Sequence, residues 1–139
     1  MCSNLQEGAS MKTFLVAAAC IIIAGCASPS ATTVSSNPTQ ASAAHNQPVC
    51  LLKTNLPANV KYSVVGPIEA SKEFYGSANE IIPLMAQEAR NVGADAIISM
   101  QTGQKIGLWA WSRPYGTGTA VKLDNKAAFN CAALGGEMR

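Results

Sequence analysis

The sequence SANEIIPLMAQEARNVGADAIISM (residues 77–100) decides the fold, because its hydrophobic period changes partway along. Ser77 and Glu80 have the spacing of a capping box, and the apolar residues that follow recur every three or four positions, which predicts an amphipathic helix. Pro83 is compatible with the first turn of that helix, where N–H groups have no intrahelical partner. Gly93 is a natural left-handed helix end, and the β-branched run after it predicts a buried strand.

Strands are predicted on both sides of this unit. Four segments have the composition of strands: 49–55, 60–64, 96–100 and 117–123. Gly66-Pro67 should break the second of these segments, with continuation through Ile68-Glu69-Ala70 past the bend as the alternative, and a long connection should join the last two segments into a hairpin. The order predicts an α+β domain: a small antiparallel-type sheet of about four strands with one main helix packed on one face.

From Met11 onward the sequence has the pattern of an export signal. Lys12 is followed by the apolar stretch 14–24 and then by small residues. Eleven apolar residues in a helix reach about 16 Å, roughly half the thickness of a hydrocarbon core. Residues 1–25 are therefore predicted to be a cleaved signal peptide rather than a membrane span.

The end of this segment, Ile23-Ala24-Gly25-Cys26, resembles the lipobox of bacterial lipoproteins. The resemblance implies cleavage before Cys26, diacylglycerol on its thiol and a further fatty acyl chain on its amine. Several acyl chains hold a protein on a bilayer far more firmly than one. Ala27 follows the cysteine in place of Asp, which implies the outer membrane, facing the periplasm, rather than the inner membrane. A soluble export signal that happens to end at a cysteine is the alternative.

Residues 1–10 do not fit the export pattern. Glu7 precedes Lys12, and the stretch has neither charge bias nor periodicity. Codons for Gln6-Glu7-Gly8 can contain AGGAGG, a ribosome-binding sequence placed shortly before the Met11 codon. We therefore expect synthesis to begin at Met11.

Residues 26–48 are predicted to be the lipidated cysteine and a flexible linker, because Ser, Thr, Ala, Asn, Gln and Pro dominate and large apolar residues are almost absent. His45 is the only histidine of the chain and is expected to be solvated there. Residues 49–125 form the predicted domain, and residues 126–139 a tail with a short helix that ends at a glycine pair.

Two of the five cysteines are expected in the folded part. Cys2 precedes the expected start, Cys20 leaves with the signal peptide and Cys26 carries lipid. Cys50 and Cys131 remain, and an oxidising periplasm favours their pairing. A disulfide closing a loop of about 82 residues would stabilise the domain by roughly 4 kcal/mol. Two separately buried thiols are the alternative.

Aromatic residues and an arginine alternate near the end of the domain. Trp109, Trp111, Arg113 and Tyr115 are spaced by two, so an extended hairpin would place them on one face until Pro114 bends it. Such a strip suits a binding surface for an envelope protein or for peptidoglycan. Packing of the tryptophans over the sheet or the helix end is the alternative.

The sequence indicates no catalytic residue, no metal site and no cofactor other than the covalent lipid on Cys26. The predicted domain contains no histidine, and its carboxylates are scattered. Asp95, beside the glycine turn, is expected to accept turn-stabilising hydrogen bonds. The chain carries a net charge of +2 without a basic run, so no nucleic-acid partner is expected.

Three short motifs resemble the YbjQ and RcsF-like group of small domains, over residues 60–123: Gly93-Ala94-Asp95-Ala96-Ile97-Ile98, Gly118-Thr119-Ala120-Val121 and Val64-Val65-Gly66. The resemblance implies a compact βαββ-type domain, a homo-oligomer as in the ring-forming members, and, in the RcsF branch, an outer-membrane lipoprotein that reports envelope stress. That branch has two disulfides, whereas no cysteine lies between Cys50 and Cys131 here. We therefore expect a lipid-anchored binding module, with envelope-stress signalling as the alternative.

Overall fold

The computed structural model describes residues 32–108 and 110–139. The predicted signal peptide, the lipidation site Cys26 and Trp109 lie outside the described residues. Within those residues, no helix has the length and apolar character needed to cross a membrane.

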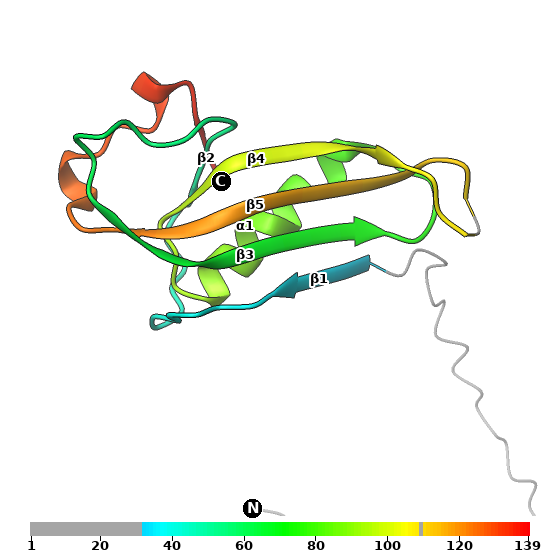
Figure 1. The fold of residues 1–139 in the computed structure, drawn as a ribbon, viewed down its shortest axis with the longest axis horizontal. Helices are drawn as coiled ribbons and strands as arrows, with labels where there is room; N and C mark the ends of the chain where they lie inside the picture. The colour runs from blue at the N-terminus through cyan, green and yellow to red at the C-terminus, as the bar shows by residue number, and fades with distance from the viewer. Residues whose placement is uncertain (1–31, 109) are drawn as a thin grey trace, which may run out of the picture.

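A mixed sheet of six strands carries the fold, with the order β1-β3-β5-β4-β2-β6 (Figure 1). The strands are β1 (Thr32–Ser36), β2 (Cys50–Leu51), β3 (Tyr62–Lys72), β4 (Ala96–Lys105), β5 (Arg113–Leu123) and β6 (Glu137–Met138). All neighbours are antiparallel except β2 and β4, which are parallel. The predicted α+β class is confirmed. The expectation of about four strands was too low, because short segments pair along both edges of the three long strands β3, β5 and β4.

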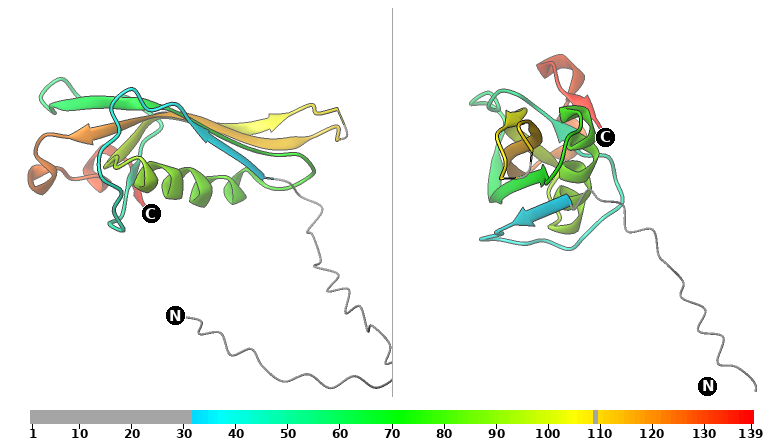
Figure 2. Two further views of the ribbon diagram at one scale, coloured as in Figure 1. Left: turned by 90° about the horizontal axis from the view of Figure 1, so that it is seen from below. Right: turned by 90° about the vertical axis from the view of Figure 1, so that its right-hand side faces the viewer.

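Helix α1 (Ile82–Asn91) packs along one face of the sheet (Figure 2). The predicted capping box is present: Ser77 accepts from the Asn79 N–H, and the Glu80 carboxylate accepts from the Ser77 N–H. It begins a short 3₁₀ turn, η1 (Ala78–Glu80), that leads into α1. Five apolar residues of this region are buried against the sheet: Ile81, Met85, Ala86, Ala89 and Val92. Gly93 ends the unit in the left-handed region, with φ 77°, as predicted.

The predicted break at Gly66-Pro67 is wrong, because β3 continues through both residues. A bulge between Val64 and Gly66 takes up the irregularity and keeps Ile68 and Ala70 on the buried face. Pro67 lacks an N–H, but its carbonyl still accepts from Asn37 at 3.4 Å. A proline is tolerated at a bulge because the ladder is already interrupted there.

Both strands of the predicted hairpin are longer than their apolar centres indicated. β4 continues from Met100 to Lys105, and β5 begins at Arg113. A second bulge, between Ile98 and Gln101, contains Ser99 at φ 51°. The bulge returns Met100 to the buried face that Ile97 also occupies. Both side chains therefore belong to the core between the sheet and α1.

The prediction of a flexible linker is wrong for residues 32–48. Strand β1 pairs with β3 from Thr32 opposite Lys72 to Ser36 opposite Ile68. The chain then continues beside β3, where the Thr39 N–H donates to the Val65 carbonyl at 2.7 Å, and crosses the end of the helix, where the Ser42 N–H donates to the Val92 carbonyl at 3.1 Å. Backbone pairing to an open strand edge needs no large apolar side chain, so composition did not reveal this ordered segment.

The predicted C-terminal helix at 126–134 is replaced by two 3₁₀ turns, η2 (Lys126–Ala128) and η3 (Ala132–Leu134). Asn125 caps the first turn, and Gly135 ends the second at φ 72°, so both end signals act as expected. Between the turns Phe129 is extended, and the Asn130 side chain accepts from the Ala133 N–H. This hydrogen bond stabilises the start of the second turn and competes with the backbone hydrogen bonds of a continuous helix.

The sheet has a core on each face. The larger core lies between the sheet and α1 and includes Val65, Ile68, Met85, Ile97 and Ala120. The smaller core lies on the opposite face at one end of the sheet, around the following residues: Cys50, Leu52, Leu56, Ala96, Ile98, Val121, Leu123 and Cys131. The remaining half of that second face has no buried cluster among the described residues.

Candidate functional site

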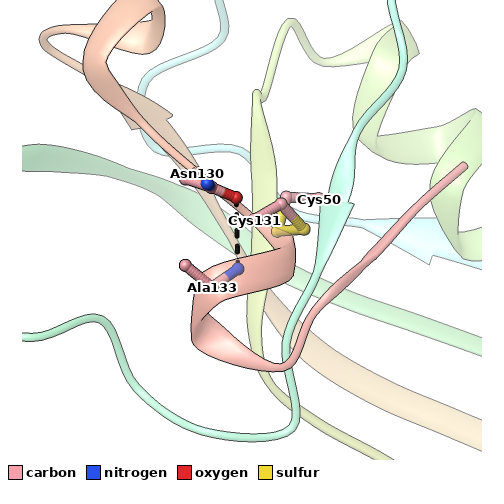
Figure 3. The surroundings of a disulfide bond; sticks show 4 residues. All are labelled: Cys50, Asn130, Cys131 and Ala133. Carbon is pink, nitrogen blue, oxygen red and sulfur yellow. Dashed lines mark hydrogen bonds between the residues drawn. A yellow bond between two sulfur atoms is a disulfide. The ribbon is translucent and has the colours of Figure 1, made fainter.

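A disulfide joins Cys50 on β2 to Cys131 at the start of η3 (Figure 3). The Cα atoms are 5.8 Å apart, and both side chains are buried within the smaller core. The predicted pairing is therefore present in the structure. It fixes the C-terminal turns to the edge of the sheet, where the backbone of Val49 also pairs with Arg139.

A groove of about 470 Å³ runs beside this disulfide. Its walls are largely apolar, with Phe129 and Met138 on them, while Asp95 and Lys126 supply charge. The Lys126 ammonium donates a hydrogen bond to the Asp95 carboxylate, so these two charges already pair with each other.

Asp95 is a buried carboxylate that holds several segments together. One oxygen, Oδ2, accepts from the Leu123 N–H at 3.2 Å and lies 3.2 Å from Lys122 Nζ; Lys126 Nζ donates to Oδ1 at 3.1 Å. Burial alone would raise the pKa of Asp95, but the hydrogen bonds from Lys122, Lys126 and the Leu123 N–H together hold that pKa below its ordinary value. Asp95 accepts hydrogen bonds, as expected, but the donors lie on β5 and η2, so the predicted stabilisation of its own turn is wrong.

His45 also reaches this cluster, so the expectation of a solvated linker histidine is wrong. Its side chain is only 17% exposed; Nε2 lies 2.8 Å from the Ala94 carbonyl oxygen and 3.8 Å from Asp95 Oδ1. The His45 N–H donates to the Arg90 carbonyl at 3.2 Å, which completes one of the open carbonyls at the end of α1.

The contacts around Asp95 join segments that are far apart in the sequence. Four chain segments meet at one carboxylate: the 37–48 segment, the turn after α1, β5 and η2. The described residues contain no group of three His, Cys, Asp or Glu side chains that could hold a metal ion. Sequence reasoning missed His45 and Lys126 as partners, because both lie far from Asp95 along the chain.

The structure places the described members of the predicted aromatic strip in two elements, and Trp109 lies outside the described residues. Trp111 precedes β5 and lies in the loop, 84% exposed, whereas Arg113 and Tyr115 belong to the strand. Pro114 was expected to bend the strand but lies within it, fully buried and opposite Gln104. It is tolerated near the start of β5, where few ladder bonds have yet formed.

Tyr115 belongs to the uncovered half of the second sheet face. Its ring lies beneath the Lys105 ammonium, 5.3 Å from Nζ, and covers Gly103 on the neighbouring strand. We call this surface the open half-face and define it by the residues Glu69, Ser71, Gln101, Lys105, Arg113, Tyr115 and Thr117. A shallow pocket of about 60 Å³ lies on it, between Glu69, Tyr115 and Thr117.

The described residues of the loop between β4 and β5 form a second exposed surface, which we call the hairpin tip (residues 106–108 and 110–112). Ile106, Leu108 and Trp111 are 79%, 90% and 84% exposed. The tip projects past the start of α1 and past the start of β1 (Figures 1 and 2). The aromatic spacing indicated only part of this tip; the charge-free run from Ile106 to Ser112 is the sequence signal that could have revealed the whole of it.

No protein-family model matches this chain, and neither a curated protein nor a solved structure matches it. The functional argument therefore rests on the residues and their geometry.

Proposed function

We propose that this chain is a lipid-anchored lipoprotein of the bacterial envelope, sorted to the outer membrane, and that its domain is a binding module without catalytic activity. The observation that carries the proposal is the order of the N-terminal segments: Lys12, the apolar stretch 14–24, and the lipobox-like sequence ending at Cys26. The disulfide between Cys50 and Cys131 supports it, because disulfides persist in oxidising compartments such as the periplasm.

The open half-face is the proposed binding surface. It offers an amphipathic ring, hydroxyl and amide groups and both charge signs on a flat strand surface, which suits a polar polymer better than an apolar ligand. Peptidoglycan is the polymer of that chemistry in the periplasm, and we propose it as the first ligand to test. Tyr115 supplies the apolar area and Lys105 and Glu69 the charged contacts.

The anchor is tested by the intact mass of the protein extracted from membranes, measured before and after reduction and alkylation. A mass equal to residues 26–139 plus one diacylglyceryl group and one amide-linked acyl chain, with alkylation of Cys50 and Cys131 only after reduction, is expected. A mass without lipid, or one that begins before Met11, would refute the proposal.

The binding surface is tested by sedimentation with purified peptidoglycan sacculi. The Tyr115→Ala protein is expected to remain in the supernatant, while wild type sediments. Tyr62→Ala is the matched control, because Tyr62 is an exposed tyrosine at the opposite end of β3. Equal sedimentation of wild type and Tyr115→Ala would remove the open half-face from the proposal. Lack of sedimentation by wild type would refute peptidoglycan as the ligand.

A further inference from the structure

The hairpin tip and the start of β1 lie at the same end of the sheet. Thr32 pairs with Lys72, one residue beyond the row formed by Ser71, Tyr115 and Gly103. β3 and β4 run toward this end, and β1 runs away from it (Figure 1). The chain therefore enters the domain from the side on which the tip projects.

The distance from the predicted lipid anchor is short. Six residue steps separate Cys26 from Thr32, and an extended chain covers at most about 20 Å in six steps. The tip extends past the row of Thr32 by up to about 13 Å, four residues at about 3.3 Å each. A lipid on Cys26 would hold this end of the domain beside the bilayer, with the tip as the part nearest to it.

The composition of the tip matches a membrane interface. Among the described residues, only Ile106, Leu108 and Trp111 are large hydrophobics with more than three quarters of their surface exposed. Lys105 and Arg113 are paired in register at the base of the tip. Tryptophan favours the headgroup level of a bilayer, and Lys and Arg extend their charged groups toward the phosphates.

We propose that the hairpin tip inserts into the headgroup region of the bilayer that carries the lipid anchor, and so fixes the orientation of the domain on the membrane. This inference rests on the lipidation of Cys26 in the proposed function. An insertion of about 5–10 Å, typical of interfacial side chains, would bury Leu108 and Trp111 and leave the open half-face in the periplasm.

The chain contains its own reporter for a test, because both of its tryptophans belong to the tip sequence. Trp109→Phe leaves Trp111 as the single fluorophore. The lipidated protein carrying this change is reconstituted into vesicles of phosphatidylethanolamine and phosphatidylglycerol and floated on a density gradient. Trp111 emission is then compared with and without acyl chains brominated near the headgroup or near the terminal methyl.

Flotation, emission at shorter wavelength and quenching strongest for bromine near the headgroup are expected. Leu108→Asp should abolish the wavelength shift and the quenching while flotation is retained. Met138→Asp is the matched control, because Met138 is a half-exposed apolar residue on β6, outside the tip, and its substitution should change neither signal. Both substituted side chains are exposed, so the fold should be retained, which circular dichroism would verify.

The two proposals fail differently in this experiment. Flotation without quenching, with Trp111 open to aqueous acrylamide, would overturn tip insertion and leave the anchor intact. A wavelength shift that appears at high protein concentration without vesicles would also overturn it, in favour of a contact between copies of the chain. Failure to float would refute the anchor and with it the inference.

Discussion

Reduction of the Cys50–Cys131 disulfide should remove a large share of the stability of the domain. The two cysteines are 81 positions apart, so the bond closes a loop of about 82 residues. The chain-entropy relation gives about 4.5 kcal/mol at 25 °C for a loop of that length. Small domains unfold with about 5–15 kcal/mol, so the loss amounts to a third or more of the total.

The measurement is urea unfolding of the mature protein, followed by circular dichroism, with and without reductant. With a slope of about 1.5 kcal/mol/M, the predicted loss moves the unfolding midpoint down by about 3 M. The Cys50→Ala/Cys131→Ala protein is the control, and its midpoint should not respond to reductant. A midpoint that moves by less than about 0.5 M on reduction would refute the reasoning. It would mean that the unfolded chain already keeps these segments together, or that strain in the native state offsets the entropic gain.

Three further substitutions test the contacts that organise the domain. Asp95→Asn should cost about 2 kcal/mol at neutral pH, because the hydrogen bonds from the Lys122 and Lys126 ammonium groups lose their charged acceptor. The pKa of Asp95 is lower in the folded state, so its contribution to the free energy of unfolding is present above the unfolded pKa of about 3.9 and is lost as the pH falls through the folded pKa. The stability of the wild type, measured as a function of pH, should therefore fall over this acidic range. The corresponding fall should be missing in Asp95→Asn. Gly93→Ala should destabilise the fold more than Gly135→Ala and should speed hydrogen exchange of the His45 backbone N–H. Both glycines have a positive φ, but only at Gly93 would an added Cβ lie 2.7 Å from the Ala43 carbonyl oxygen. Equal thermal unfolding temperatures for the two variants would contradict this. Gly116→Val should lower the unfolding temperature by pushing α1 from the sheet, because even a Cβ there would lie 2.5 Å from a methionine sulfur of α1.

The helix and the strand after it could be predicted because their information is local. The capping box at Ser77, the apolar spacing and Gly93 all lie within one stretch of 24 residues, and each favours the same structure. The pairing of Cys50 with Cys131 could also be predicted, since only two cysteines remain once the N-terminal ones are assigned elsewhere. That prediction needed only the number of remaining cysteines and no knowledge of where they lie in the fold.

The errors come from contacts between distant segments. Strand β1 exists because β3 offers an unpaired edge, and nothing within residues 32–36 indicates that edge. The bulge at Gly66 depends on the neighbouring strands, so local rules for Gly-Pro predicted a break. His45 has a partner only because the 37–48 segment crosses the end of α1. A composition typical of linkers thus conceals an ordered segment whose hydrogen bonds are mostly made by the backbone.

The ordering of residues 32–48 changes what the anchor can do. A flexible tether of that length would let the domain tumble freely above the membrane, and any face could meet the bilayer. With β1 paired to β3, and Ser36 Oγ bonded to the Glu88 carboxylate on α1, five residues would separate a lipidated Cys26 from the start of the sheet. Such a short connection would keep the hairpin tip near the bilayer and give it a high effective concentration there, so that even weak insertion would be favoured. The pairing of one short edge strand would then link the lipid on Cys26 to the direction in which the open half-face points.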